Sequence, residues 1–328
     1  MKKKNKKFNF VFNSDVDLEG NSIKIFLKKK IFSIFTYLKK LRKNFENIER
    51  SKKIEGNKVF FKDNDNNFFL DLEKKLQRNF YIYNEFENHH SQILEAVIKP
   101  NTIVIDIGAN VGILSIKFAN ILKKKEFNKD EKNKYEGKVI SFEPSKNTFY
   151  ELLFNIEINK DQKHSTIEAF NLGLGIKTED KIFYEIKDPN MQHSHAFIKN
   201  NLFKNEEKKI IETKVKCVSL DEFFLDKYEQ KISLIKIDTG GDELDIIKGS
   251  KKIIVKFNPT ILFEFDRDRI KYLNISPSSY NYIFELKYKV YLILENGFLY
   301  EINSFDEAFY YPGKFFEICC MPKQISND

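Results

Sequence analysis

The sequence predicts an α/β fold built on an open, doubly wound sheet of mostly parallel strands. From Thr102 onward, short apolar runs alternate with helical segments. Such runs, separated by helices, are typical of buried parallel strands. Near the end, two strand-like runs flank Glu295-Asn296-Gly297 and a further run follows. This pattern predicts a C-terminal antiparallel hairpin and a last strand. The predicted core strands lie at residues 103–108, 138–144, 166–175, 233–238, 260–265, 290–302 and 315–322.

Length and composition narrow the class of protein. The chain has 328 residues, of which 41% are apolar, enough for a sizeable core, so a wholly disordered chain is excluded. We find neither an apolar run long enough for a membrane span nor a convincing secretory signal. The three cysteines, Cys217, Cys319 and Cys320, cannot form a disulfide framework. We read the neighbouring pair as small core residues and expect a cytoplasmic protein.

The net charge of +8 is unevenly placed. Residues 1–58 contain 17 Lys and Arg against 6 Asp and Glu, a local net charge of +11, which leaves −3 for the remainder. The basic excess therefore belongs to the N-terminal segment. Because the body is slightly acidic, we expect no nucleic-acid partner.

The predicted organisation has two parts, a basic extension at residues 1–57 and a body at 58–328. Within the extension, apolar residues recur at helical spacing in residues 31–45. This helix could lie on an anionic membrane surface, giving a peripheral contact through residues 23–48. We favour instead a helix packed on the body or on a second subunit.

The body itself is predicted to open with a hairpin and a lead-in helix before its core. The hairpin is indicated by apolar runs around Asp63-Asn64-Asp65-Asn66, and the helix by residues 87–98. Together they occupy residues 58–100, and the Rossmann-like core occupies 101–322. We interpret the charged segment 123–137 as a solvated insertion.

The sharpest local signal is the turn after the first core strand. The strand ends at Asp106, turns through Gly108 and enters a helix near Asn110 and Gly112. Ligands of open α/β sheets bind outside the carboxyl ends of the strands, so this turn predicts a ligand site. The next strand ends at Glu143, whose carboxylate could accept two hydrogen bonds from a ribose diol.

Two classes of cofactor bind at a turn of this kind with an acid at the end of the next strand. A dinucleotide needs a glycine-rich turn that lets its pyrophosphate sit on a helix N-terminus. Here Asn110 stands where the close-approach glycine should be. S-adenosylmethionine carries no phosphate, and acidic and amide groups suit its ammonium and carboxylate. The residue types therefore favour S-adenosylmethionine over NAD.

Five blocks in order resemble the FkbM family of class I methyltransferases. They are VIDIGANVGILSI, VISFEPSKNTFYELLFNIEIN, VSLDEFF, LIKIDTGGDELDIIKGSKKII and PTILFEF, and the match extends over roughly residues 83–322. The resemblance implies a seven-stranded methyltransferase fold that binds S-adenosylmethionine and methylates hydroxyl groups of sugars or related small molecules. The expected acceptor is therefore a small molecule or a glycan.

The resemblance also implies roles for individual residues. Asp106, Gly108, Ala109 and Asn110 would line the methionine end of the cofactor, and Glu143 would hold the ribose hydroxyls. An upstream Phe86-Glu87 matches a Tyr-Glu element of the family, which adds Glu87 to the cofactor set. The remaining implied contacts lie near the adenosine, at Pro144, Ser145, Asn155, Leu172, Gly173 and Leu174. Asp238, at the end of the fourth strand, would face the transferred methyl group.

Transfer of a methyl group to a hydroxyl oxygen is helped by a general base. Asp238 is the first candidate and Glu264 the second, followed by His193 or His195 in a segment predicted to be irregular; His89 and His90 are predicted to be exposed. A magnesium site at Asp238, Asp242, Glu264 and Asp266 is an alternative. Acidic residues are common at strand ends, and we favour ion pairing within Asp266-Arg267-Asp268-Arg269 at the surface; no metal is predicted.

One departure from the family concerns residues 238–243, Asp-Thr-Gly-Gly-Asp-Glu. The family usually carries an acid where this chain has Gly240, and Glu243 keeps its family position. The glycine at this position leaves an alternative function open: a catalytically weak or silent protein that retains cofactor binding. An NAD-dependent oxidoreductase and a nucleic-acid methyltransferase remain as disfavoured alternatives.

Overall fold

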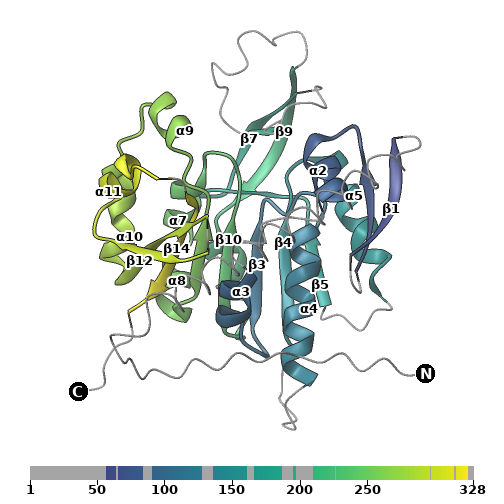
Figure 1. Ribbon diagram of the computed structural model, residues 1–328, viewed down its shortest axis with the longest axis horizontal. Coiled ribbons are helices and arrows are strands. Elements are labelled where there is room, and N and C mark those ends of the chain that lie inside the picture. The colour runs from purple at the N-terminus through teal and green to yellow at the C-terminus, as the bar shows by residue number, and fades with distance from the viewer. Residues whose placement is uncertain are drawn as a thin grey trace, which may run out of the picture. The chain divides into compact units, whose positions relative to one another are not determined.

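The main sheet contains eight strands in the order β13-β12-β14-β11-β10-β3-β4-β5 (Figure 1). The computed structural model of the chain describes residues 57–63, 66–83, 91–127, 136–160, 166–186, 195–196, 210–225, 227–295, 297–313 and 315–323. Five neighbouring strands are parallel: β5 (Thr166–Phe170), β4 (Lys138–Phe142), β3 (Ile103–Ile107), β10 (Ile232–Ile237) and β11 (Thr260–Phe263). Three strands continue the sheet with antiparallel pairings: β14 (Phe315–Pro322), β12 (Tyr288–Leu294) and β13 (Leu299–Ile302).

This topology confirms the predicted doubly wound α/β fold with its C-terminal antiparallel hairpin. The sheet has eight strands rather than seven because β13, the second strand of the hairpin, pairs with β12 at the sheet edge.

Helices cover both faces of this sheet because its buried strands alternate their side chains between two cores. Val104, Leu234 and Leu262 pack with helices α3 and α4 on one face. The neighbouring Ile105 and Ile235 pack into the core of the opposite face. The first layer comprises α3 (Ser91–Val97) and α4 (Ile113–Phe127). The second core includes residues of α6 (Leu220–Phe224), α7 (Glu243–Gly249), α8 (Lys251–Phe257), α9 (Arg267–Tyr272), the 3₁₀ helix η4 (Pro277–Asn281), α10 (Tyr282–Glu285) and α11 (Phe305–Tyr310).

Side-chain caps fix where several helices begin. The Ser145 hydroxyl accepts a hydrogen bond from the Thr148 N–H and starts α5 (Lys146–Glu157). Ser219 caps α6 in the same way, and Asp266 caps α9 through two backbone N–H groups. Serine and aspartate are preferred at this position because their oxygens satisfy N–H groups that the helix leaves unpaired. The α5 cap therefore places the helix directly after Glu143.

A second, four-stranded sheet has the order β6-β9-β7-β8. Its strands are β6 (Gly173–Leu174), β7 (Glu179–Ile186), β8 (His195–Ala196) and β9 (Ile210–Val218). The strands β7 and β9 project away from the main sheet at the top of Figure 1. This sheet was not predicted from the sequence, and the prediction of an irregular segment around His195 is wrong in part. His195 pairs with Glu185 in an antiparallel ladder, because β7 offers it an edge.

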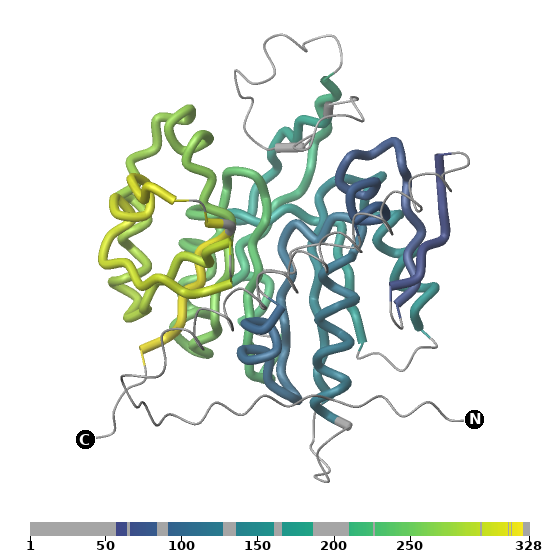
Figure 2. Tube along the Cα trace, in the orientation of Figure 1, coloured from purple at the N-terminus to yellow at the C-terminus, as the bar shows by residue number. Residues whose placement is uncertain are grey.

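The body begins with the predicted hairpin, made of β1 (Lys58–Asp63) and β2 (Asn66–Asp71). Helix α2 (Lys75–Tyr83) follows and was not predicted; it buries Gln77 and Phe80, so its inner face is partly polar. In Figure 2 the purple hairpin lies at the right of the view, and the yellow C-terminal strands lie at the left, where they form that end of the main sheet. Of the predicted lead-in helix 87–98, the structure describes α3.

The described residues test several of the sequence predictions only in part. Residues 1–56 lie outside the described residues, so the boundary at residue 57 stays a prediction. The part of the chain that the structure describes contains no helix with the length and apolarity of a membrane span. All three cysteines are buried and free, which for Cys319 and Cys320 agrees with the expectation of small core residues.

Candidate functional site

The turn between β3 and α4 is tightly bound to the ends of two neighbouring strands. The N–H groups of Gly108 and Ala109 both donate to the Phe142 carbonyl, each at 3.0 Å. Gly108 has a φ of +81°, and a Cβ there would lie 1.9 Å from the carbonyl oxygen of Asp238. Only glycine allows this approach of two backbones. The turn therefore holds together the carboxyl ends of β3, β4 and β10.

The Glu143 carboxylate is clamped between that turn and α5. Its Oε2 accepts from the Asn110 N–H and its Oε1 from the Ser145 N–H, both at 2.9 Å. Burial raises the pKa of Glu143 to about 7, although both backbone hydrogen bonds act in the opposite direction. Glu185 of β7, which accepts from the Ser145 hydroxyl at 2.5 Å, adds a further raising charge. Glu143 is thus a fixed acid that titrates near neutral pH.

Asp106 lies in a buried polar row beneath α4. Its Oδ2 accepts from the Ser115 hydroxyl at 2.5 Å, and Ser115 accepts from the Ser141 hydroxyl at 2.9 Å. Ser141, Asp106 and Lys236 are register partners on three adjacent strands. Because register partners share a face of the sheet, the row runs across its carboxyl end. Asp106 is 2% exposed, so it supports the turn from below.

Lys236 connects the candidate base to β14, two strands away in the sheet. It is 1% exposed, and its Nζ lies 2.6 Å from Glu317 Oε1 on β14 and 3.7 Å from Asp238 Oδ2. A buried ammonium is costly unless it is paired. The Asp238 side chain itself is 43% exposed. Lys236 therefore fixes the position of an acid that remains accessible.

The loop after Asp238 is braced by Glu243. Glu243 Oε1 accepts from the Thr239 N–H at 3.3 Å, the Thr239 hydroxyl at 3.2 Å and the Gly241 N–H at 3.0 Å. Burial raises the pKa of Glu243, which is 4% exposed. The glutamate thus organises the loop that precedes α7.

Glu264, the second candidate base, follows β11 and faces the same region. Burial, and then the charge of Asp238, raise the pKa of Glu264 to about 8, while Arg269 opposes the shift. Arg269 Nη1 lies 3.8 Å from Glu264 Oε2. Within the described residues, no three His, Cys, Asp or Glu side chains are grouped as a metal site. The alternative magnesium site at Asp238, Asp242, Glu264 and Asp266 therefore has no support from the geometry.

The implied adenosine residues differ in accessibility. Ser145 is buried as the α5 cap, Pro144 is half-buried, and Leu174 is 2% exposed within the hydrophobic core. Asn155 is fully buried and donates to the Val111 carbonyl at 2.9 Å, so it holds the first turn against α5. The predicted residues Glu87, His89, His90 and His193 lie outside the described residues.

The domain comparison decides the family. The methyltransferase FkbM domain matches residues 106–298, more than half of the chain. The chain belongs to the FkbM methyltransferase family. The match includes every described residue of the candidate site except those of β14, and it confirms the family inferred from the five sequence blocks. The chain matches no curated protein sequence.

Solved structures similar to this FkbM chain include other methyltransferases. The methyltransferase FkbM of Methylobacillus flagellatus KT has 15% identity and a TM-score of 0.39, with coverage of 74% of this chain and 52% of that one. The chain thus spans about half the length of that protein. A precorrin-6y C5,15-methyltransferase from Geobacter metallireducens GS-15 has 10% identity, a TM-score of 0.34 and coverages of 70% and 86%. P. horikoshii TYW2 in complex with MeSAdo has 14% identity, a TM-score of 0.35 and coverages of 81% and 72%.

The candidate site also contains residues that no sequence motif indicated. Lys236 is a charged residue inside an apolar strand, and that contrast was a usable signal. Glu317 had a similar signal in the last strand, between Phe316 and Ile318. Arg269 and Tyr280 lie in polar sequence segments that suggest surface helices. Only the packing of α9 and η4 brings them to the site.

Proposed function

We propose that this FkbM-family chain is an S-adenosylmethionine-dependent methyltransferase that acts on a hydroxyl group of a saccharide or a related small molecule. The observation that supports the proposal is that the backbone N–H groups of the turn between β3 and α4 are already hydrogen-bonded. The N–H groups of residues 108–112 all donate within the protein, to Phe142, Glu143, Asn110 and Ala109. This turn therefore offers no free backbone donor to a pyrophosphate, which a dinucleotide requires.

The residues present fit S-adenosylmethionine. Glu143 uses one acceptor position on each oxygen for backbone N–H groups, and an ionised carboxylate has about four such positions. Two remain for a ribose diol. Asn110, with its φ of +50°, would lie at the methionine end together with Gly108 and Ala109. When bound, the cofactor supplies a methyl group that is already activated for transfer.

The chain's own contribution is then to position the acceptor hydroxyl and to take its proton. Asp238 is exposed at the end of β10, and its carboxylate is held by Lys236. Glu264 lies beside it with a raised pKa and takes the proton most readily when ionised. Two carboxylates therefore stand beside the proposed methyl position despite the glycine at residue 240. This favours an active enzyme over a silent one.

Three measurements test the proposal. Calorimetry should detect S-adenosylmethionine binding and no NAD binding. Labelled methyl groups should pass from the cofactor to a hydroxyl of at least one glycan in a panel. Asp238→Asn should keep cofactor affinity and lower transfer, whereas the matched control Asp245→Asn on α7 should leave both unchanged. Cofactor binding without transfer to any hydroxyl would favour a silent binding protein instead.

A further inference from the structure

The buried lysine of β10 lies between an acid in the protein interior and an accessible one. Lys236 Nζ is 2.6 Å from Glu317 Oε1 on β14 and 3.7 Å from Asp238 Oδ2 at the end of β10. Glu317 is 4% exposed, whereas the Asp238 side chain is 43% exposed. The FkbM match ends at residue 298, before β14 begins, so the family domain does not include Glu317. Together the three groups form a charged row that leads from the interior to the candidate base.

The sheet brings the charged row to one face. Lys236 and Asp238 are two residues apart along the chain, so their side chains project to the same side. The register runs from Lys236 through Leu262 of β11 to Cys319 of β14. Glu317 is two residues from Cys319 and shares its face. The glutamate therefore reaches Lys236 from two strands away.

The two distances give the Lys236 ammonium a different relation to each acid. At 2.6 Å, its contact with Glu317 is as short as a charge-assisted hydrogen bond. At 3.7 Å, its contact with Asp238 is an electrostatic attraction, since N–H···O hydrogen bonds extend to about 3.2 Å. Lys236 thus attracts the Asp238 carboxylate without taking up one of its acceptor positions.

This distinction matters because a general base needs an open acceptor position for the hydroxyl proton. A hydrogen bond from an ammonium would occupy such a position. It would also favour the charged form of the carboxylate, which makes that carboxylate a weaker proton acceptor. Without Glu317, the Lys236 ammonium would be drawn toward Asp238, because a buried ammonium is costly unless it is paired.

We propose that Glu317 is a positioning residue for methyl transfer: it binds the Lys236 ammonium and so keeps Asp238 available to accept the hydroxyl proton. The inference rests on the proposed function and takes Asp238 as the base. Glu317 itself is buried and acts only through Lys236.

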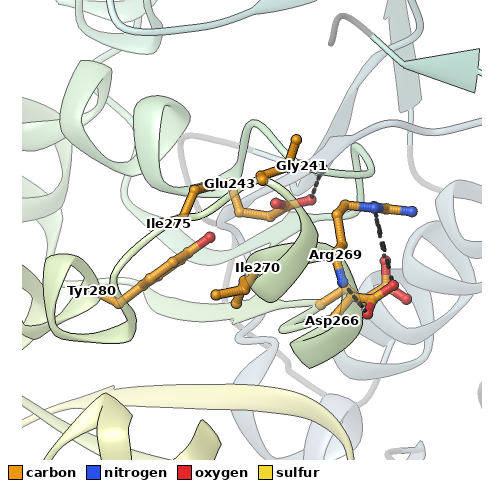
Figure 3. A pocket seen from close by; sticks show the side chains of 9 residues that line it. Gly241, Glu243, Asp266, Arg269, Ile270, Ile275 and Tyr280 are labelled. Atoms are coloured by element: carbon orange, nitrogen blue, oxygen red, sulfur yellow. Dashed lines mark hydrogen bonds and ion pairs between the residues drawn. The ribbon is translucent and has the colours of Figure 1, made fainter. Parts of the chain in front are cut away.

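Several other charged side chains surround Asp238 and Lys236. They are Asp106 of β3, Glu243 of α7, Glu264 after β11, and Asp266 and Arg269 of the adjoining pocket. Figure 3 shows this pocket, with Arg269 turned toward Asp266. None of these groups changes when Lys236 or Glu317 is replaced, so a shift in the titration of Asp238 reports on the charged row.

The experiment follows the Asp238 carboxyl by NMR in the full chain, labelled with ¹³C at its aspartate carboxyls and without added cofactor. The Asp238 signal is the one that Asp238→Asn removes. Glu317→Gln releases the Lys236 ammonium toward Asp238, so the midpoint of the Asp238 titration should fall by about 1 pH unit or more. Methyl transfer to a glycan acceptor should also become slower, because the carboxylate is then a weaker base.

The double variant Lys236→Met, Glu317→Gln removes the ammonium as well. The Asp238 midpoint should then rise above that of the unsubstituted chain, because the attracting charge is gone. A purely structural role for Glu317 does not predict shifts of opposite sign. Replacing both members of a buried ion pair costs less than breaking it, so the double variant tests the row even if the single variant unfolds.

Glu301→Gln is the matched control, because Glu301 pairs with Lys289 at 3.4 Å on the edge hairpin of the same sheet. It should leave the Asp238 midpoint and the transfer rate unchanged. The inference is overturned if Asp238 titrates in Glu317→Gln as in the unsubstituted chain, or if the double variant does not raise the midpoint. Absence of transfer by the unsubstituted chain overturns the proposed function instead, and the titration, which needs no turnover, distinguishes the two failures.

Discussion

At the scale of single residues, Glu143 makes cofactor binding sensitive to pH. Its pKa of about 7 means that the carboxyl is mostly protonated at pH 6 and mostly ionised at pH 8. Ribose hydroxyls donate to the ionised form, so binding is coupled to loss of a proton. The affinity for S-adenosylmethionine should therefore rise about tenfold from pH 6 to pH 8 and then level off. Calorimetry across this range, repeated with Glu143→Gln, measures the effect; an equal rise in the variant would assign it to another group.

The two candidate bases predict different pH profiles for methyl transfer. The pKa of Glu264 is raised to about 8, and a base must be ionised to take the hydroxyl proton. If Glu264 is the base, kcat/KM rises with pH up to about 8, and Glu264→Gln removes that limb together with most of the rate. If Asp238 is the base, Asp238→Asn removes the rate and Glu264→Gln keeps it. Rates from pH 6 to 9.5 for both variants decide between the two residues.

The site residues that the sequence could predict are those of contiguous motifs. Asp106, Gly108 and Glu143 follow strands directly, and strand ends of a parallel sheet meet at one edge. Lys236 and Glu317 meet only because β10 and β14 flank β11 in the sheet order. Tyr280 and Arg269 come from separate helical segments. Local sequence periodicity does not predict contacts between such distant segments, so these residues could be assigned to the site only from the structure.

At the scale of elements, two amide side chains, one in α5 and one just after its end, act as a partner for the outer edge of β2. Asn155 accepts from the Phe69 N–H at 2.7 Å, and Asn159 accepts from the Asn67 N–H at 2.9 Å while donating to its carbonyl at 2.7 Å. The pair, one helical turn apart, matches backbone groups two residues apart on the strand. Without it, buried groups of β2 would lose their partners, which is costly.

This pair allows a matched test of what holds the first turn. Asn155 also donates to the Val111 carbonyl, whereas Asn159 makes no hydrogen bond to the turn among the described residues. Asn155→Ala and Asn159→Ala should each lower the free energy of unfolding by about 2 kcal/mol or more. Only Asn155→Ala should also weaken S-adenosylmethionine binding, because it releases the turn. Denaturant unfolding and calorimetry check both; equal cofactor affinities would mean that α5 does not position the turn.

The core strands were predictable because their runs are almost wholly apolar, with few polar residues such as Asp106 in β3 and Lys236 in β10. The strands β3, β4, β10 and β11 are buried along almost their whole length. The ladder of β7 and β9 escaped prediction because its residues are mostly charged or half-exposed. Alternation in Lys214-Val215-Lys216-Cys217 was the one available signal for a strand with a single buried face.

At the scale of the whole molecule, charge separates the chain into two regions. Residues 1–58 carry +11, whereas the remainder, which contains the candidate site, carries −3. The FkbM match begins only at residue 106, so the basic excess lies outside the family domain. The methyltransferase chemistry proposed for the body has no need of a polyanion, and the basic segment therefore calls for a separate role.

Removal of residues 1–55 tests that role. If the segment binds an anionic membrane surface, the full chain should sediment with phosphatidylserine vesicles at low salt, and 0.5 M salt should release it, because salt screens charges over about 4 to 5 Å at that concentration. The truncated chain should not sediment, yet should keep its cofactor affinity and melting temperature. Phosphatidylcholine vesicles are the matched control for the lipid.

If the segment instead packs on the body, truncation lowers the melting temperature. Vesicle binding is then absent even for the full chain, since the apolar stripe at residues 31–45 would already be buried against protein.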